Sequence, residues 1–299
     1  MAEPAPGAVI GFVGLGNMGH PMAARLAAAG YRVRAYDRDP AACAALAATS
    51  GVTIADGAAA AAAGAAAVIL MLPDSGIVDS VVHDAGLLDA LGPGTYLIDM
   101  GSSVPTRTRD LALEVAARGA ALVDAPVSGG VRGALAGSLT IMVGGEPGPA
   151  EAVRPVLETM GGKVPHVGPP GAGHALKALN NLMSATHLLV SSEAILVGRE
   201  FGLDPAVMLD AVNGSTGRSG STQEKWPKFM LDRGFGSGFA LRLMLKDMRI
   251  ATGLAESTGR PARLGAAATD LWAEAAESLP GDADHTEILR WLESLCEDP

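Results

Sequence analysis

The sequence of 299 residues has little of what marks secreted, disulfide-rich or membrane proteins. Its two cysteines, Cys43 and Cys296, lie near opposite ends and supply neither a disulfide framework nor a close pair of metal-binding thiols. The first eight residues hold no basic side chain and no apolar core, so we expect no secretory or transit leader. The most apolar stretch, residues 58–72, is interrupted by Gly64 and is shorter than the roughly 20 residues of a membrane span. We therefore expect a soluble, cytoplasmic protein in a reducing compartment.

Positive charge is also scarce. Lysine and arginine total 22 against 32 aspartates and glutamates, for a formal net charge of −10, which argues against nucleic acid or an anionic membrane as a partner. The six histidines show no HxxxH or HxH spacing, so no metal site is predicted. The sequence also contains no GxSxG motif that would favour a hydrolase.

The order of apolar runs predicts two domains. From residue 8 to about 167, short β-rich runs alternate with Ala/Leu-rich stretches, a pattern typical of a doubly wound parallel sheet with helices on both faces. Asp56 and Pro105 signal helix starts in this part, and Gly119 signals a helix end. We predict an α/β domain at residues 1–168 and an all-helical domain at 169–299. The predicted strands are residues 8–13, 31–37, 67–72, 95–100, 120–124 and 139–143. The predicted C-terminal helices are residues 172–201, 205–213, 241–257 and 262–279, with a Gly/Ser-rich loop at 214–221.

A glycine-rich segment follows the first predicted strand and opens a helix. Its sequence is Gly14-Leu15-Gly16-Asn17-Met18-Gly19. In this context the first glycine allows a tight turn, the second lets a pyrophosphate approach the backbone, and the third permits close packing of helix on strand. The next predicted strand ends at Asp37, about twenty residues on, where a carboxylate can accept both ribose hydroxyls of an adenine dinucleotide. The combination favours a dinucleotide site over a glycine-rich turn without a ligand.

The residues around Asp37 bear on the choice of dinucleotide. Its carboxylate would repel a 2′-phosphate, which favours NAD. Arg38 follows directly, with Arg32 and Arg34 nearby, and an arginine beside that ribose could accommodate the phosphate of NADP. The alternative for Arg38 is a solvated surface charge. We predict NAD as the cofactor, with NADP possible.

Two further segments suggest a small carboxylate as substrate. Residues 124–130 (DAPVSGG) follow a predicted strand at its carboxyl end, where Ser128, Gly129 and Gly130 would offer a hydroxyl and unhindered N–H groups to an anion; a turn without a ligand is the alternative. In residues 171–181 (GAGHALKALNN), Lys177 and Asn181 share one helical face with Ser184.

The lysines of two predicted helices each allow two interpretations. A half-buried Lys177 beside a cationic nicotinamide would have its pKa lowered toward that of a proton-transfer group, or it is a solvated lysine on an exposed face. The pair Lys246-Asp247 lies inside an apolar helical pattern, so either the two form a polar network or Lys246 reaches into a cleft.

Taken together, these segments resemble the β-hydroxyacid dehydrogenase family, which includes 3-hydroxyisobutyrate dehydrogenases and tartronate semialdehyde reductases. GFVGLGNMGHPMA, Leu72-Pro73, DAPVSGG, GAGHALKALNN and LMLKDMRIA occur in the family's order over nearly the whole chain. The resemblance implies that Lys177 is the catalytic acid/base, that Asn181 helps to hold the substrate, and that Ser128, Gly129 and Gly130 bind its carboxylate. It implies cofactor contacts at Gly14 to Gly19, Asp37, Leu72, Pro73, Ser102 and Lys246. Where the family commonly has a Ser-Thr pair, this sequence has Gly101-Ser102, so only the second hydroxyl is present.

The resemblance also implies a Rossmann-like domain and an all-helical domain joined by a long helix that usually builds a dimer or tetramer. We expect a small 3-hydroxy acid or its semialdehyde as substrate. In oxidation, neutral Lys177 would take the hydroxyl proton while a hydride passes to C4 of the nicotinamide, and in reduction the protonated lysine would return the proton. An imine reductase on the same scaffold is the alternative, against which the lysine itself argues, and a non-catalytic dinucleotide-binding protein is another.

The segment 213–226 is the candidate for substrate specificity. It contains Arg218 and Ser219, and Arg218 would favour a second acidic group such as a carboxylate or sulfonate. A solvated surface loop is the alternative. His285 is expected to cap or pack the last helix rather than to titrate in the reaction.

Overall fold

The computed structural model describes residues 2–295, so Cys296 lies outside the described residues. The chain divides into two compact units, Met1–Lys177 and Ala178–Pro299. This division lies inside the long helix α10 (Ala172–Glu200), whereas the predicted boundary after residue 168 precedes that helix. None of the helices among residues 2–295 is long and apolar enough to cross a membrane.

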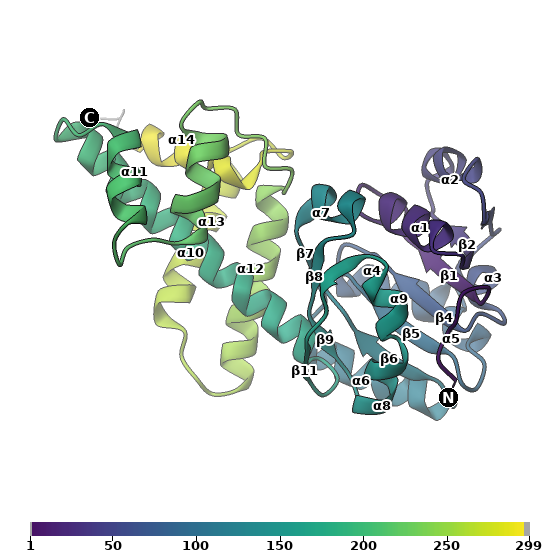
Figure 1. The fold of residues 1–299 in the computed structure, drawn as a ribbon. Helices are drawn as coiled ribbons and strands as arrows, with labels where there is room; N and C mark the ends of the chain where they lie inside the picture. The colour runs from purple at the N-terminus through teal and green to yellow at the C-terminus, as the bar shows by residue number, and fades with distance from the viewer. Residues whose placement is uncertain (1, 296–299) are drawn as a thin grey trace. The chain divides into compact units, whose positions relative to one another are not determined.

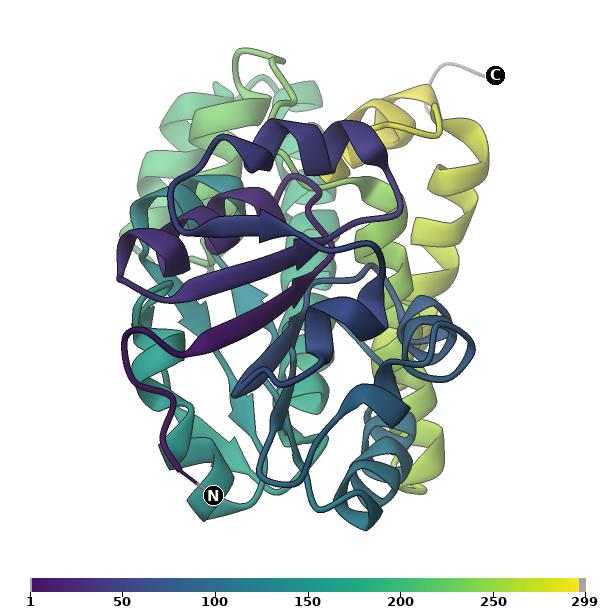
Figure 2. The same ribbon diagram turned by 90° about the vertical axis from the view of Figure 1, so that its right-hand side faces the viewer.

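The first unit contains an eight-stranded sheet of order β11-β9-β6-β5-β4-β1-β2-β3 (Figures 1 and 2). Its strands are β1 (Val9–Val13), β2 (Arg32–Tyr36), β3 (Val52–Ile54), β4 (Ala67–Leu70), β5 (Tyr96–Asp99), β6 (Ala121–Asp124), β9 (Val143–Gly144) and β11 (His166–Gly168). Neighbouring strands are parallel except for the antiparallel pair β6 and β9. The order β3-β2-β1-β4-β5-β6 is that of the doubly wound dinucleotide-binding sheet, which confirms the predicted fold class of this unit.

The predicted strand at 139–143 is wrong as one element. The chain instead forms β8 (Leu139–Ile141) and β9, which belong to different sheets; β8 pairs with β7 (Val127–Ser128) and β10 (Gly161–Lys163). Met142 separates them, and its backbone N–H donates to the carbonyl of Pro126. Because the apolar pattern continues through Met142, the sequence gives no sign of the break.

Helices cover both faces of the main sheet. They are α1 (Gly19–Ala28), α2 (Pro40–Ala47), α3 (Ala58–Ala62), α4 (Ser75–Asp79), η1 (Ser80–Asp84), α5 (Leu87–Ala90), α6 (Pro105–Ala117), α7 (Gly130–Ala136), α8 (Pro147–Ala152) and α9 (Arg154–Glu158). Helix α6 starts at Pro105 and is followed by Gly119 at φ +73°, as predicted. The start signal at Asp56 is wrong, because the N-cap of α3 is Gly57 and no side chain caps it. Arg34 instead donates to the carbonyls of Ala60 and Ala63 at the other end of α3.

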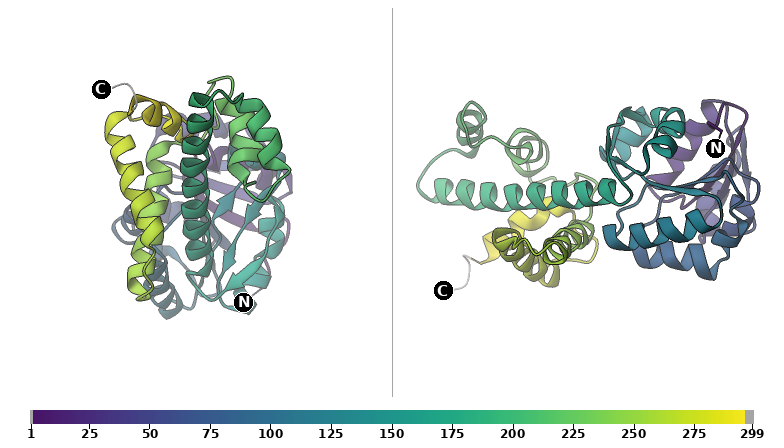
Figure 3. Two further views of the ribbon diagram at one scale, coloured as in Figure 1. Left: turned by 90° about the vertical axis from the view of Figure 1, so that its left-hand side faces the viewer. Right: turned by 90° about the horizontal axis from the view of Figure 1, so that it is seen from below.

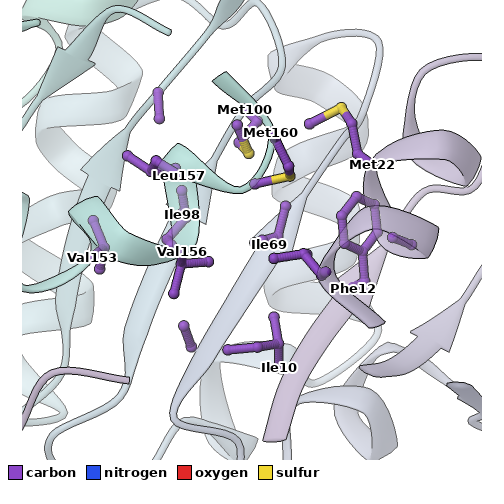
Figure 4. Packing of buried hydrophobic residues seen from close by; sticks show 14 of the residues in the cluster. Ile10, Phe12, Met22, Ile69, Ile98, Met100, Val153, Val156, Leu157 and Met160 are labelled. Atoms are coloured by element: carbon purple, nitrogen blue, oxygen red, sulfur yellow. The ribbon is translucent and has the colours of Figure 1, made fainter. Parts of the chain in front are cut away.

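Successive residues of the central strands enter two separate cores, one on each face of the sheet. Ile69 of β4 packs in one core, and its neighbours Val68 and Leu70 pack in the other. Figure 4 shows the first core, where Phe12 of β1 and Ile98 of β5 lie among side chains of α1 and α9. Burial on both faces explains why these strands read as continuous apolar runs.

The second unit is helical. After α10 it contains α11 (Pro205–Asn213), η2 (Ser221–Met230), α12 (Leu241–Ser257), α13 (Arg263–Ser278), η3 (His285–Glu287) and α14 (Ile288–Ser294), and Figure 3 shows α10 as one continuous helix. Its core includes Trp226, Trp272 and Trp291. The predicted helices are confirmed to within a residue or two. The predicted loop 214–221 ends earlier, because helical structure begins at Gly220 and continues as the π-helix η2.

Candidate active site

The three glycines of the segment Gly14–Gly19 have the geometry that a bound pyrophosphate requires. Gly14 has φ +98°, and a Cβ there would overlap the carbonyl oxygen of Met71. A Cβ on Gly19 would overlap the carbonyl oxygen of Gly14, whereas one on Gly16 would meet no atom within 4 Å. The fold thus requires glycine at positions 14 and 19, whereas the space beside the Cα of Gly16 is open. The first turn of α1 has no side-chain cap and no acidic residue, which suits a phosphate at this helix end.

Asp37 follows β2 and holds the glycine-rich segment in place. Its Oδ2 accepts the backbone N–H of Leu15 at 2.6 Å, and its Oδ1 accepts that of Asp39 at 2.8 Å. Each carboxylate oxygen has a second lone pair, so both remain able to accept a ribose hydroxyl. The residues present therefore fit an adenine dinucleotide.

The three arginines near this site are not equivalent. Arg34 is engaged with α3, and Arg32 donates to the carbonyl of Gly7. Arg38 is exposed, and no hydrogen bond or ion pair connects it to the other described residues. Arg38 is thus the arginine that could meet a 2′-phosphate.

The loops after β4 and β5 carry the next predicted contacts. Leu72 and Pro73 lie between β4 and α4, and Ser102 lies partly exposed after β5. A Cβ on Gly101 would overlap the carbonyl oxygen of Leu72, and the Gly101 N–H donates to Asp99 Oδ1 at 2.9 Å. Close approach of the two loops therefore explains why a serine is absent from position 101.

Ser128 ends β7, Gly130 begins α7, and Gly129 lies between them. Gly129 has φ +127° and Gly130 φ +60°, conformations that other residues rarely adopt. Both glycines are exposed, and Ser128 is half-buried. Backbone N–H groups and one hydroxyl are thus available here, as an anion site requires.

A buried polar cluster that sequence reasoning missed lies at the start of α10. Asp124, at the end of β6, accepts the N–H of Gly171 at 2.8 Å and that of His174 at 2.9 Å. The His174 ring contacts Thr108 Oγ1 at 2.8 Å and lies 3.6 Å from the carboxylate of Asp99. The sequence signal was available, because Asp99 and Asp124 are acidic residues at the carboxyl ends of apolar strands. Three residues after His174, α10 presents Lys177.

In the helical unit, Asn181 belongs to a polar network with the pair Lys246-Asp247. Its Nδ2 donates to Asp247 Oδ2 at 2.6 Å, and Lys246 Nζ lies 3.1 Å from Asp247 Oδ1. Asp247 is buried, while a quarter of the Lys246 side chain is exposed. Of the two interpretations left open, the polar network is present; a cofactor contact by Lys246 stays a prediction.

Parallel strands bring most of the predicted residues of the first unit to one edge of the sheet. The loops after β1, β2, β4, β5 and β6 all leave the carboxyl ends of adjacent strands, where open α/β sheets bind ligands. They carry the glycine-rich segment, Asp37, Leu72-Pro73, Ser102 and the chain leading to Ser128. A fold and an edge of this kind are typical of a dinucleotide-binding protein.

Comparisons with known proteins agree with this class and narrow it. Residues 9–168 match the model of the NAD binding domain of 6-phosphogluconate dehydrogenase, and residues 171–292 match that of the NAD-binding domain of NADP-dependent 3-hydroxyisobutyrate dehydrogenase. The chain is 40% identical to the 3-hydroxyisobutyrate dehydrogenase of Pseudomonas aeruginosa, covering 92% of this chain and 94% of the relative. It is 37% identical to the 2-(hydroxymethyl)glutarate dehydrogenase of Eubacterium barkeri, covering 96% and 95%.

A solved structure of Mycobacterium tuberculosis 3-hydroxyisobutyrate dehydrogenase with L-serine superposes with a TM-score of 0.90 at 36% identity, over 96% of this chain and 99% of that one. The chain belongs to the β-hydroxyacid dehydrogenase family, as its motifs predicted. It is an NAD-dependent hydroxyacid oxidoreductase, and NADP is compatible with its family. The roles of its individual site residues stay predictions.

Proposed function

We propose that this protein interconverts a 3-hydroxy acid of the form HOCH2–CH(R)–COO⁻ and its semialdehyde, with Lys177 as the acid/base. The observation that carries the proposal lies within the first unit. Asp124 anchors the start of α10 to the sheet edge that also carries the glycine-rich segment and Asp37. Lys177 is on the second turn of that helix, at the edge where a dinucleotide would bind.

The substrates named for the relatives support the common core. 3-Hydroxyisobutyrate, 2-(hydroxymethyl)glutarate and L-serine, for which an NAD-dependent dehydrogenase is also among the relatives, each contain a primary alcohol on the carbon next to the one that bears a carboxylate. They differ only in R, which is a methyl, a carboxyethyl or an ammonium group. We infer that Ser128, Gly129 and Gly130 bind the shared carboxylate through the Ser128 hydroxyl and backbone N–H groups.

The residues that fit the cofactor would hold it from both ends. The segment Gly14–Gly19 would receive the pyrophosphate, Asp37 the adenine ribose, and Leu72, Pro73, Ser102 and Lys246 the remainder. When bound, NAD supplies the acceptor for the hydride that leaves the carbinol carbon. Carboxylate binding at Ser128 would fix that carbon in position, which lowers the entropic part of the barrier.

Lys177 would accept and return the proton of the substrate hydroxyl. In oxidation the neutral amine accepts the hydroxyl proton as the carbinol carbon loses its hydride, so an aldehyde remains; in reduction the ammonium returns the proton to the carbonyl oxygen. Asn181 Nδ2 donates one of its two hydrogens to Asp247, and this bond fixes the orientation of the amide group and so of the second hydrogen. We propose that this second hydrogen donates to the substrate oxygen.

The test is the loss of nicotinamide absorbance as NADH reduces short carboxylate semialdehydes, with Lys177→Ala in parallel. Removal of the acid/base should lower kcat about 10²- to 10⁴-fold. Cofactor affinity, measured by NADH fluorescence, should stay within a factor of about two, because Lys177 adds no essential cofactor contact. A variant as active as the parent would refute the assignment of Lys177.

We propose that the protein forms a homodimer, or a homotetramer built from two such dimers, through α10. Met183, Val190 and Val197 recur every seventh residue along that helix, and they are exposed by 53, 56 and 70%. An exposed apolar row at this spacing suits a second helix, and the second copy is its natural occupant. Analytical ultracentrifugation of Val190→Glu should show a shift toward monomer, and an unchanged mass would contradict this interface.

A further inference from the structure

A buried histidine at the start of α10 has no role in the proposed reaction. His174 is on the first turn of that helix, and its side chain is fully buried. Lys177 lies three residues later, so the two side chains are neighbours on the helix surface. Both residues, and every contact of the His174 ring described below, belong to the first unit.

Asp99 holds the loop after β5 on both sides of Ser102. Its Oδ1 accepts the N–H of Gly101 at 2.9 Å, and its Oδ2 accepts the hydroxyl hydrogen of Ser103 at 2.7 Å. The two chain neighbours of Ser102, the predicted cofactor contact, are thus bound to one buried carboxylate. A displacement of Ser102 would therefore be transmitted to Asp99.

The same stretch of chain also contacts the start of α10. Thr108 Oγ1 lies 2.8 Å from Nδ1 of His174, and Arg109 Nε donates to the carbonyl of Pro170 at 3.2 Å. A Cβ on Gly171 would overlap the carbonyl oxygen of Pro105, so the backbones approach closely here. Residues 99–109 thus carry a predicted cofactor contact and also touch the start of the helix that presents Lys177.

The other nitrogen of the His174 ring faces Asp99. Nε2 is buried, has no hydrogen-bond partner among residues 2–295, and lies 3.6 Å from Asp99 Oδ2. The carboxylate favours a hydrogen on Nε2, and Nδ1 can then accept the hydroxyl hydrogen of Thr108. A buried donor without an acceptor is unfavourable, and a movement of about 0.7 Å would bring the two atoms to hydrogen-bond distance.

We propose that His174 is a positioning residue that couples the loop of Ser102 to α10, so that dinucleotide binding fixes the orientation of Lys177. The inference rests on the proposed function, in which Ser102 contacts the cofactor and Lys177 transfers the proton. When Ser102 holds a dinucleotide, Asp99 and His174 come within hydrogen-bond distance and the start of α10 becomes more rigid. Linkage then requires that this rigid helix start also favours dinucleotide binding.

The first experiment compares His174→Leu with the parent in the reduction by NADH of the semialdehyde that the parent reduces fastest. The variant should fold, because Thr108 can still donate to the Val104 carbonyl at 3.2 Å and Asp99 keeps its two donors. We expect kcat to fall about tenfold, since the acid/base is misplaced, and the Kd of NADH to rise about three- to tenfold. KM for the semialdehyde should change less than about twofold, because Ser128 and the two glycines after it belong to a different segment.

Two further variants and a matched control distinguish positioning from general stability. His174→Gln should restore the parent values, because its amide can accept from Thr108 and donate to Asp99, and Thr108→Val should reproduce part of the loss. Thr95→Val is the control: Thr95 is as buried as Thr108, donates to the Ala65 carbonyl at 3.2 Å, and precedes β5 at the opposite end of that strand. It should lower the melting temperature as Thr108→Val does, but leave kcat and the Kd of NADH unchanged. Equal kcat in His174→Leu and the parent, or equal losses of kcat in the two threonine variants, would overturn the proposal.

Hydrogen exchange separates this coupling from the proposed reaction. Addition of NAD to the parent should slow the exchange of the backbone N–H groups of residues 172–177 at least about threefold, and His174→Leu should remove this protection. If the parent shows this pattern but reduces none of the semialdehydes, the coupling stands and the proposed reaction does not. An equal effect of NAD on residues 172–177 in the two proteins would overturn the coupling whatever the activity.

Discussion

Asp124 and His174 are fifty residues apart, yet the carboxylate of the first accepts the backbone N–H of the second at 2.9 Å. The other oxygen of Asp124 accepts the N–H of Gly171, so the aspartate satisfies two free donors at the start of α10. A strand end thereby fixes where the helix with Lys177 begins.

Asp124→Asn should therefore destabilise the protein although the side chain keeps its shape. An amide accepts at one atom and donates at the other, so one of the two helical N–H groups would face an NH2 group. We expect a loss of about 2–3 kcal/mol in the free energy of unfolding, measured in urea. Asp89→Asn is the control: Asp89 is 76% exposed in its ion pair with Arg118, and its loss should cost less than about 0.5 kcal/mol. Equal effects of the two variants would contradict the anchoring role.

Two glycines of the same motif should respond differently to alanine. In Gly19→Ala the new methyl would overlap the carbonyl of Gly14, so we expect a loss of about 3 kcal/mol or failure to fold. In Gly16→Ala the methyl enters open space, so the melting temperature should hold while NAD affinity falls at least about tenfold. Calorimetry and thermal denaturation measure both. A Gly16→Ala protein that binds NAD as tightly as the parent would contradict a pyrophosphate at this position.

The charge of Asp37 should set the preference between the two dinucleotides. Asp37→Asn keeps an acceptor for the Leu15 N–H and removes the repulsion of a 2′-phosphate, so the NADP/NAD ratio of kcat/KM should rise about tenfold or more. Adding Arg38→Gln should reverse part of the gain. Asp39→Asn, two residues on at the cap of α2, should leave the ratio within about twofold. An equal change of the NADP/NAD ratio in Asp37→Asn and in Asp39→Asn would instead indicate a general effect of charge.

The stability of the protein should fall in mild acid because of His285. Burial lowers the pKa of His285 below its ordinary 6.5, outweighing the hydrogen bond to the Asp284 carboxylate that raises it. Below pH 6.5 the unfolded chain then binds a proton that the folded chain does not, so the free energy of unfolding decreases as the pH falls. One such group contributes at most about 1.4 kcal/mol per pH unit, and nothing well above pH 6.5. Urea unfolding at pH 7.5, 6.5 and 5.5 should show that the free energy of unfolding depends less on pH in His285→Gln than in the parent. An unchanged pH dependence would exclude His285 as the cause of the loss in acid.

The fold was predictable where the signal is local. Continuous apolar runs marked the central strands because both faces of the sheet are buried, and proline and glycine marked the ends of α6. Elements of only three residues, such as β3 and β10, gave no such signal. The π-helix η2 contains Pro227 and begins in a run of glycine and serine, so its composition favoured a loop.

The candidate site was predictable only in part, for the same reason. The glycine motif Gly14–Gly19 could be predicted because the strand before it and the helix after it are also evident from the sequence. The hydrogen bond between Asn181 and Asp247 joins residues 66 apart, and so does the contact between Thr108 and His174. Such pairs depend on how helices pack, and no spacing in the sequence encodes them.

The continuous helix α10 separates two kinds of evolutionary change. Lys177, Asn181 and Ser184 keep their relative heights because each added residue advances the helix by a fixed rise, and a one-residue insertion between them would rotate the later side chain by about 100°. Insertions within α10 and insertions in the turns before η2 should therefore differ in effect, because only those within α10 change which side chains share its faces.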